Sequence, residues 1–162
     1  MGGISYFRPG VRTMKSQVIT ISICAALLAG CQGTSTESAV AQAQEDAAEN
    51  TREARVDAAA EIAGADERVA DAERAYARTD AVASNALTRA ESEAMIETAN
   101  ANFDVARTTA VGDYDVEKEK CDALTGVVKD ACISTADATF AASELAAIST
   151  RDAALVAAEF HE

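Results

Sequence analysis

The sequence predicts an all-α protein built from long, alanine-rich helices, and three observations support this prediction. Residues 31–162 contain 36 alanines, and alanine has the highest helix propensity of any residue. The only proline, Pro9, lies before this region, so no proline interrupts it. The larger apolar residues recur at helical spacing, with charged residues between them.

The first predicted helix covers residues 38–84. Its apolar seam repeats every seven residues and has an alanine four residues before each large member, as in a closely packed or weakly associating coiled coil. The seam consists of Ile62, Val69 and Tyr76, preceded by Ala58, Ala65 and Ala72. Before Ile62 the only large apolar residues are Val40 and Val56. We therefore expect residues 38–61 to form a solvated stalk.

The same segment carries a run of carboxylates, each four residues after the last. The run is Glu45, Glu49, Glu53, Asp57 and Glu61. Like charges at this spacing destabilise an isolated helix by ~0.2–0.5 kcal/mol per pair. Two interpretations remain open: a solvated face on an acidic protein, or a binding surface for cations or a basic partner.

Residues 85–162 are predicted to form an antiparallel helical hairpin that reverses at Gly126, a natural helix C-cap. Each arm has an apolar stripe that needs a partner, and antiparallel docking buries both stripes at once. The first stripe is Ile96, Ala99, Phe103, Ala106, Ala110, Tyr114, Cys121 and Leu124. The second is Ile133, Ala136, Phe140, Leu145, Ile148 and Leu155. The helices are expected to pack in a coiled-coil-like manner.

Cys121 and Cys132 lie five and six residues from Gly126, so a reversal there brings them together as a disulfide. In an unbroken helix they would be ~16 Å apart by the 1.5 Å rise, beyond disulfide reach. The competing arrangement is a bond between two chains whose helices run straight through Gly126. A zinc site needs four ligands, and the only histidine is His161, so we expect no metal.

The first thirty residues are predicted to be a targeting segment. Arg8, Arg12 and Lys15 precede an apolar stretch over 18–28, which is shorter than the ~20 residues that span a bilayer. The stretch ends in Leu28-Ala29-Gly30-Cys31, where the small residues let a peptidase approach the backbone. This motif resembles the lipobox of bacterial lipoproteins at every position.

The lipobox resemblance implies removal of residues 1–30 by cleavage between Gly30 and Cys31, a diacylglycerol group on the Cys31 thiol, and acylation of the new amino terminus. Several acyl chains hold a protein stably to a membrane, whereas one does so only marginally. Residues 31–37 would then form a polar tether. Gln32, rather than Asp, follows the lipidated cysteine. By the same resemblance, the protein is expected in the outer membrane, facing the periplasm, rather than in the inner membrane.

The run from Asp113 to Cys132 resembles small exported alanine-rich helical proteins of proteobacteria. It contains their Lys-Cys, Gly, Lys-Asp and Cys elements, with ten residues between the cysteines. That group has no established activity. The resemblance therefore supports the hairpin and implies no function.

Charge and motifs exclude several classes of function. The net charge is −13, and residues 31–162 hold 27 acidic against 11 basic side chains, which argues against a nucleic-acid partner. No nucleophile elbow, phosphate-binding glycine loop or His-Glu-x-x-His motif is present. We expect no enzyme activity, no small-molecule substrate and no cofactor other than the covalent lipid.

The sequence favours a structural or protein-interaction lipoprotein of the cell envelope. Its expected partners are the membrane, through the lipid anchor, and either a helical protein or further copies of itself. One alternative is an acidic module that sequesters cations or basic peptides. Another is a stress-protective, hydrophilic helical protein.

Overall fold

A computed structural model describes residues 33–78 and 82–161, and all regular structure within them is helical. Helix α1 spans Gly33–Tyr76, α2 spans Val82–Asp122 and α3 spans Gly126–Glu159. The predicted all-α fold is confirmed. Helix α1 includes residues 33–37, which the sequence analysis expected in the tether. It ends at Tyr76 and α2 begins at Val82, whereas the first helix was expected to extend to residue 84.

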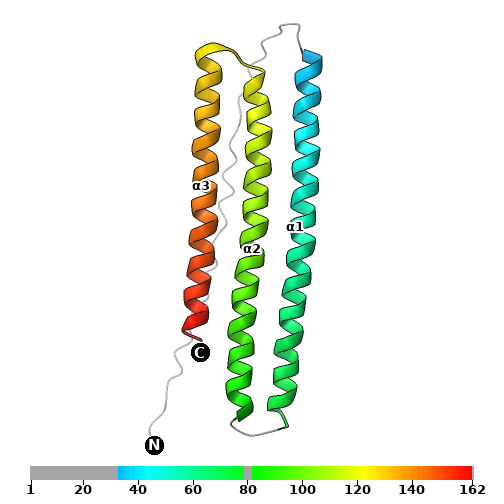
Figure 1. Cartoon of the computed structure of the whole chain (residues 1–162), viewed down its shortest axis with the longest axis vertical. Helices are drawn as coiled ribbons and strands as arrows, with labels where there is room; N and C mark the ends of the chain where they lie inside the picture. Colours follow the sequence, from blue (N-terminus) through cyan, green and yellow to red (C-terminus); the bar gives the residue numbers. More distant parts are fainter. Residues whose placement is uncertain (1–32, 79–81, 162) are drawn as a thin grey trace, which may run out of the picture. The chain divides into compact units, whose positions relative to one another are not determined.

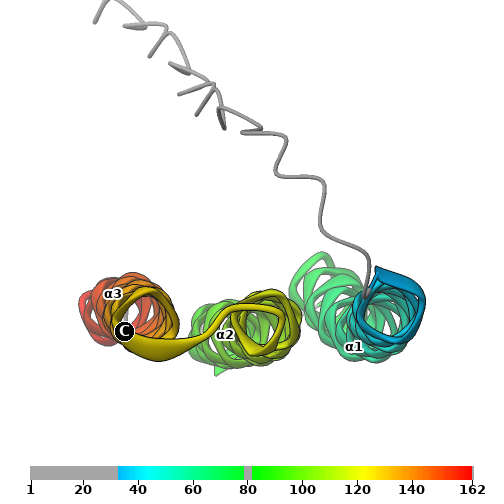
Figure 2. The ribbon, with the colours of Figure 1, turned by 90° about the horizontal axis from the view of Figure 1, so that it is seen from above.

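The three helices lie side by side in one layer with α2 in the middle (Figures 1 and 2). Neighbouring helices run in opposite directions, so α1 and α3 point the same way (Figure 1). Both α1 and α3 pack along α2, and within the described residues they do not contact each other. Helix α2 is therefore covered on two opposite sides, whereas α1 and α3 each keep an outer side in solvent.

The core of this layer consists mainly of alanine. The buried apolar residues are Ala58, Ala65, Ala99, Ala101, Ala110, Val116, Cys121, Ala136, Ala147 and Ala158. The larger residues of the predicted α1 seam lie at the margin, and Tyr76 is 50% exposed. Short side chains at the contact allow two helices to approach closely, because interaxial distance depends on the side chains between them.

The buried positions of the α2–α3 hairpin recur every eleven residues. Ala99, Ala110 and Cys121 are buried on α2, and Ala136, Ala147 and Ala158 are buried on α3. Eleven residues make three turns of about 3.67 residues each, close to the 3.6 of an undistorted helix. The two helices can thus stay in contact along their length with little supercoiling. The predicted stripes contained Ala99, Ala110, Cys121 and Ala136 but missed Ala147 and Ala158.

Residues 38–61 are not a free stalk, because this part of α1 lies against α2. The closest approach is at Gly112, where an added Cβ would lie 2.7 Å from the Cβ of Ala47. Ala58 lies eleven residues after the half-buried Ala47, and it is buried. The stalk prediction counted large apolar residues only. It therefore overlooked an interface made from alanine and glycine.

Leu145 was predicted on the stripe of α3 that docks on α2, and this prediction is wrong. Its side chain is 68% exposed, whereas Ala147, two positions further on, is buried against α2. The core of the hairpin selects small residues, so the larger leucine lies outside it.

The chain reverses between α2 and α3 over residues 123–125. The last turn of α2 is tightened by hydrogen bonds from the Ala123 and Leu124 amides to the carbonyls of Lys120 and Cys121. Gly126 then opens α3 with a φ of +61°, in the left-handed region that disfavours other residues. The glycine thus marks the reversal, as predicted, although it begins α3 instead of capping α2.

Candidate functional site

The disulfide at the reversal joins the two cysteines that were predicted to pair. Cys121 and Cys132 are bonded, with their Cα atoms 5.6 Å apart, within the usual range for a disulfide. Cys121 is fully buried. An ion pair between Lys129 and Asp122, at 2.9 Å, bridges the same reversal. The predicted disulfide-stapled hairpin is thus confirmed.

An aromatic cluster lies about two helical turns along the hairpin from the disulfide. The rings of Tyr114 and Phe140 are 4.9 Å apart between centroids, and the ammonium of Lys118 lies 5.2 Å from the Tyr114 ring. The Tyr114 hydroxyl donates a hydrogen bond of 2.7 Å to the Asp137 carboxylate. This hydrogen bond is the main reason why the pKa of Tyr114 is raised, and burial and the neighbouring carboxylates raise it further. The cluster joins α2 to α3.

The opposite end of the hairpin is closed by polar contacts. The buried Ser92 hydroxyl on α2 donates to the Ala158 carbonyl on α3 at 3.1 Å. His161 Nε2 lies 3.0 Å from a Glu91 carboxylate oxygen. Together with the disulfide, these contacts hold α3 on α2 at both ends. Sequence reasoning missed Ser92, because a single serine in an alanine-rich helix gives no sign that it is buried.

An acidic groove of about 770 Å³ runs between α1 and α2. Six carboxylates and two cationic side chains line it. The carboxylates belong to Asp46, Glu53, Asp57, Asp115, Glu119 and Asp122, and the cations to Arg107 and Lys118. Two members of the predicted acidic run, Glu53 and Asp57, thus face this groove. Glu61 lines a second hollow with Gly64, Arg68 and Glu97, where Arg68 forms an ion pair with Glu97 between α1 and α2.

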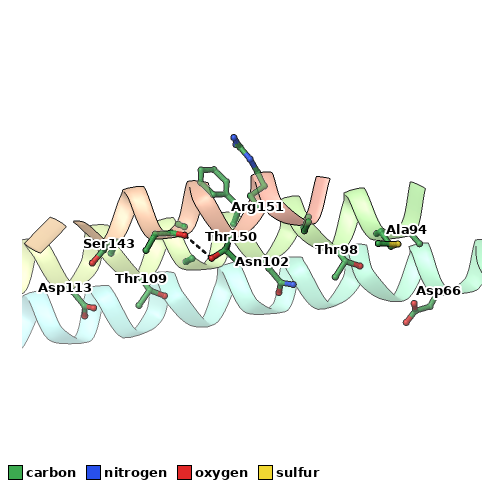
Figure 3. A pocket seen from close by; sticks show the side chains of 17 residues that line it. Asp66, Ala94, Thr98, Asn102, Thr109, Asp113, Ser143, Thr150 and Arg151 are labelled. Carbon is green, nitrogen blue, oxygen red and sulfur yellow. Dashed lines mark hydrogen bonds between the residues drawn. The ribbon is translucent and has the colours of Figure 1, made fainter. Parts of the chain in front are cut away.

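A second groove, of about 830 Å³, is lined mainly by alanine, threonine and serine of α2 and α3 (Figure 3). Thr98, Asn102 and Thr109 line it from α2, and Ser143 and Thr150 line it from α3 (Figure 3). Asp66 of α1 and Asp113 lie at its margins, and the Arg151 guanidinium is stacked 4.5 Å from the Phe103 ring centroid. This groove is therefore much less charged than the acidic groove.

Within residues 33–78 and 82–161, no three His, Cys, Asp or Glu side chains converge in a way that would hold a metal ion. No helix in those same ranges is both long and apolar enough to cross a membrane. The predicted cleavage and lipidation residues, Gly30 and Cys31, lie outside the described part of the chain.

No protein-family model, curated protein or solved structure matches this chain. Any functional conclusion therefore rests on its own residues.

Proposed function

We propose that the protein is a lipoprotein of the bacterial outer membrane, anchored by lipid on Cys31, with a structural or protein-interaction role in the periplasm. The observation that carries this proposal is the motif Leu28-Ala29-Gly30-Cys31, which follows a basic segment and an apolar stretch. Cys31 lies two residues before the start of α1. At 1.5 Å per residue, the 44 residues of α1 span ~66 Å, enough to project far from a membrane.

Two features of the helical layer support this proposal. The disulfide between Cys121 and Cys132 suits an exported protein, because disulfides persist in the periplasm and are rare in the cytosol. The layer also offers long faces and open grooves, as a structural or docking protein needs.

The anchor is tested by replacing the acceptor cysteine. Cys31→Ala is expected to abolish incorporation of a clickable fatty acid and to block processing, because no thiol remains to carry the diacylglycerol. The matched control is Cys24→Ala, which removes a cysteine from the apolar stretch and should leave labelling intact. Equal label on wild type and Cys31→Ala would contradict the proposal.

The acidic groove favours a second candidate function, the capture of basic peptides. Its six carboxylates outnumber its two cations, so a basic segment would be attracted along α1 and α2. Partners recovered from envelope extracts should then be lost above ~0.3 M salt, where the Debye length falls well below 10 Å. Glu53→Gln with Asp57→Asn should weaken capture more than Glu45→Gln with Glu49→Gln, a matched pair outside the groove. Capture that survives high salt would contradict a charge-driven function.

A further inference from the structure

The outer side of α3 differs in charge from the outer side of α1. Helix α3 has seven charged residues: Lys129, Asp130, Asp137, Glu144, Arg151, Asp152 and Glu159. At 100° per residue they all fall within an arc of about 140°, one edge of which lies at the side packed on α2. The remaining ~220° of the helix bears no charge. In contrast, the outer side of α1 carries charges such as Glu45, Glu49 and Glu67.

The uncharged side of α3 exposes several large apolar residues. Val127 is 83% exposed, Leu145 68%, Val156 50% and Phe160, directly after the helix, 88%. Exposed alanines lie between them, and we call this surface the α3 strip. A protein with a net charge of −13 has many charged residues with which to cover a solvent-facing helix, yet none lies here. An apolar strip of this extent marks an interaction surface.

Four of the hydroxyl groups next to the strip are already satisfied within α3. Thr135, Thr139, Ser143 and Thr150 each donate to the carbonyl four residues earlier, at 2.9–3.0 Å. Because a hydroxyl has one proton to donate, none of these donors would lose a partner if the surface were covered. Covering these four hydroxyl groups therefore costs no unpaired donor, whereas the exposed Ser149 on the strip would need a partner in the covering surface.

We propose that the α3 strip is the interface between two copies of this chain, with their α3 helices side by side and pointing in the same direction. The distribution of charged residues favours a second copy of the chain as the partner that covers the strip. Two acidic chains repel each other wherever their charged faces meet, and the strip lets them approach without such contact. A basic partner would find no carboxylate on the strip. A membrane-binding helix would carry Lys or Arg along its polar face, whereas five of the seven charges of α3 are acidic.

The size of the strip suits a weak, reversible dimer. The 34 residues of α3 span about 51 Å at 1.5 Å per residue. With a width of ~10 Å, the strip covers ~500 Å² on each copy, or ~1,000 Å² in total, the lower limit for a specific interface.

The charges at the edges of the strip fix the relative direction of the two helices. One edge is acidic, with Asp130, Asp152 and Glu159, and the other carries Thr139 and Thr150. A two-fold axis parallel to the helices brings each acidic edge against the uncharged edge of the other copy. An axis perpendicular to them would place acidic edge on acidic edge, which is repulsive. The parallel pairing would also leave both lipid anchors at the same end, although the interface does not depend on the anchor.

In-cell disulfide cross-linking of the full chain tests this proposal. In the parallel arrangement Val156 faces Val156 of the second copy, so Val156→Cys should yield a disulfide-linked dimer on non-reducing electrophoresis. The matched control is Val56→Cys on α1, where the valine is also exposed, at 63%, and lies outside the strip. The control also reports any cross-linking through an unlipidated Cys31, so failure of the anchor can be told from failure of the interface.

Leu145→Glu in the Val156→Cys background should remove the cross-link and leave the far-UV circular dichroism unchanged, because Leu145 contributes little to the buried core. Equal dimer yields from Val156→Cys and Val56→Cys would overturn the proposal. So would cross-linking through Leu145→Cys, near the middle of α3, without cross-linking through Val156→Cys, since this is the pattern of antiparallel helices.

Discussion

Loss of the Cys121–Cys132 bond is expected to lower the free energy of unfolding by roughly 3 kcal/mol, the value that loop-closure entropy gives for a loop of this size. The effect should be severe, because the buried residues are mainly alanines, which contribute little hydrophobic free energy individually. We expect α3 to separate from α2 near the reversal first. The Lys129–Asp122 ion pair adjoins the lost bond, and the Tyr114–Phe140 contact and the Tyr114–Asp137 hydrogen bond follow further along the hairpin.

Urea unfolding of the full chain, followed by far-UV circular dichroism with and without reductant, measures this effect. Alanine is the better replacement for both cysteines, because Cys121 is fully buried and a serine hydroxyl there would need a partner. Reductant should have no further effect on the double variant Cys121→Ala/Cys132→Ala. A midpoint that is the same in the oxidised and reduced wild-type chain would show that the bond does not stabilise the hairpin.

Gly112→Ala and Gly64→Ala are expected to change stability in opposite directions, although each replaces a helical glycine by alanine. At position 112 the new Cβ would lie 2.7 Å from the Ala47 Cβ and 3.1 Å from its Cα, so α1 must move away from α2. Overpacking of this kind typically costs 1–3 kcal/mol, which exceeds the ~1 kcal/mol gained from helix propensity. At position 64 the nearest atom is the flexible end of Arg68, at 3.8 Å. Only the gain of about 1 kcal/mol applies there.

Thermal or urea unfolding of the two variants beside the wild type gives the comparison. A larger residue, as in Gly112→Val, should destabilise the packing of α1 on α2 further. It should also make α1 more sensitive to protease, while the disulfide-bonded hairpin stays protected. Stabilisation by Gly112→Ala equal to that by Gly64→Ala would show that α1 does not dock on α2 at this point.

The same pair of glycines shows where sequence reasoning falls short for this fold. Both lie in alanine-rich helical segments, and nothing local separates them. Their difference arises only because Gly112 meets Ala47, sixty-five positions earlier in the chain. A search for small residues at eleven-residue spacing would have found Ala47 and Ala58 on α1, and Ala101 and Gly112 on α2. The heptad pattern predicted Ile62, Val69 and Tyr76 as the packing seam, but these residues lie at the margin of the interface.

The helices, the reversal at Gly126 and the disulfide could be predicted from the amino-acid sequence, because each depends on residues close together in the chain. Alanine content and the lack of proline favour helix locally, and two cysteines on either side of one glycine meet when the chain turns back. The lipid anchor is likewise inferred from a short motif, Leu28-Ala29-Gly30-Cys31, and remains to be tested.

Which helix faces are covered became clear only from the packing of the three helices. Alanine is compatible with both a buried and an exposed position, so its pattern alone does not select a partner. In the structure, α2 takes both neighbours on opposite sides, residues 38–61 dock instead of standing free, and Leu145 faces outward. The reason is physical: contact energy in this core comes from the close approach of backbones. Such approach depends on how two distant segments fit, which neither segment specifies alone.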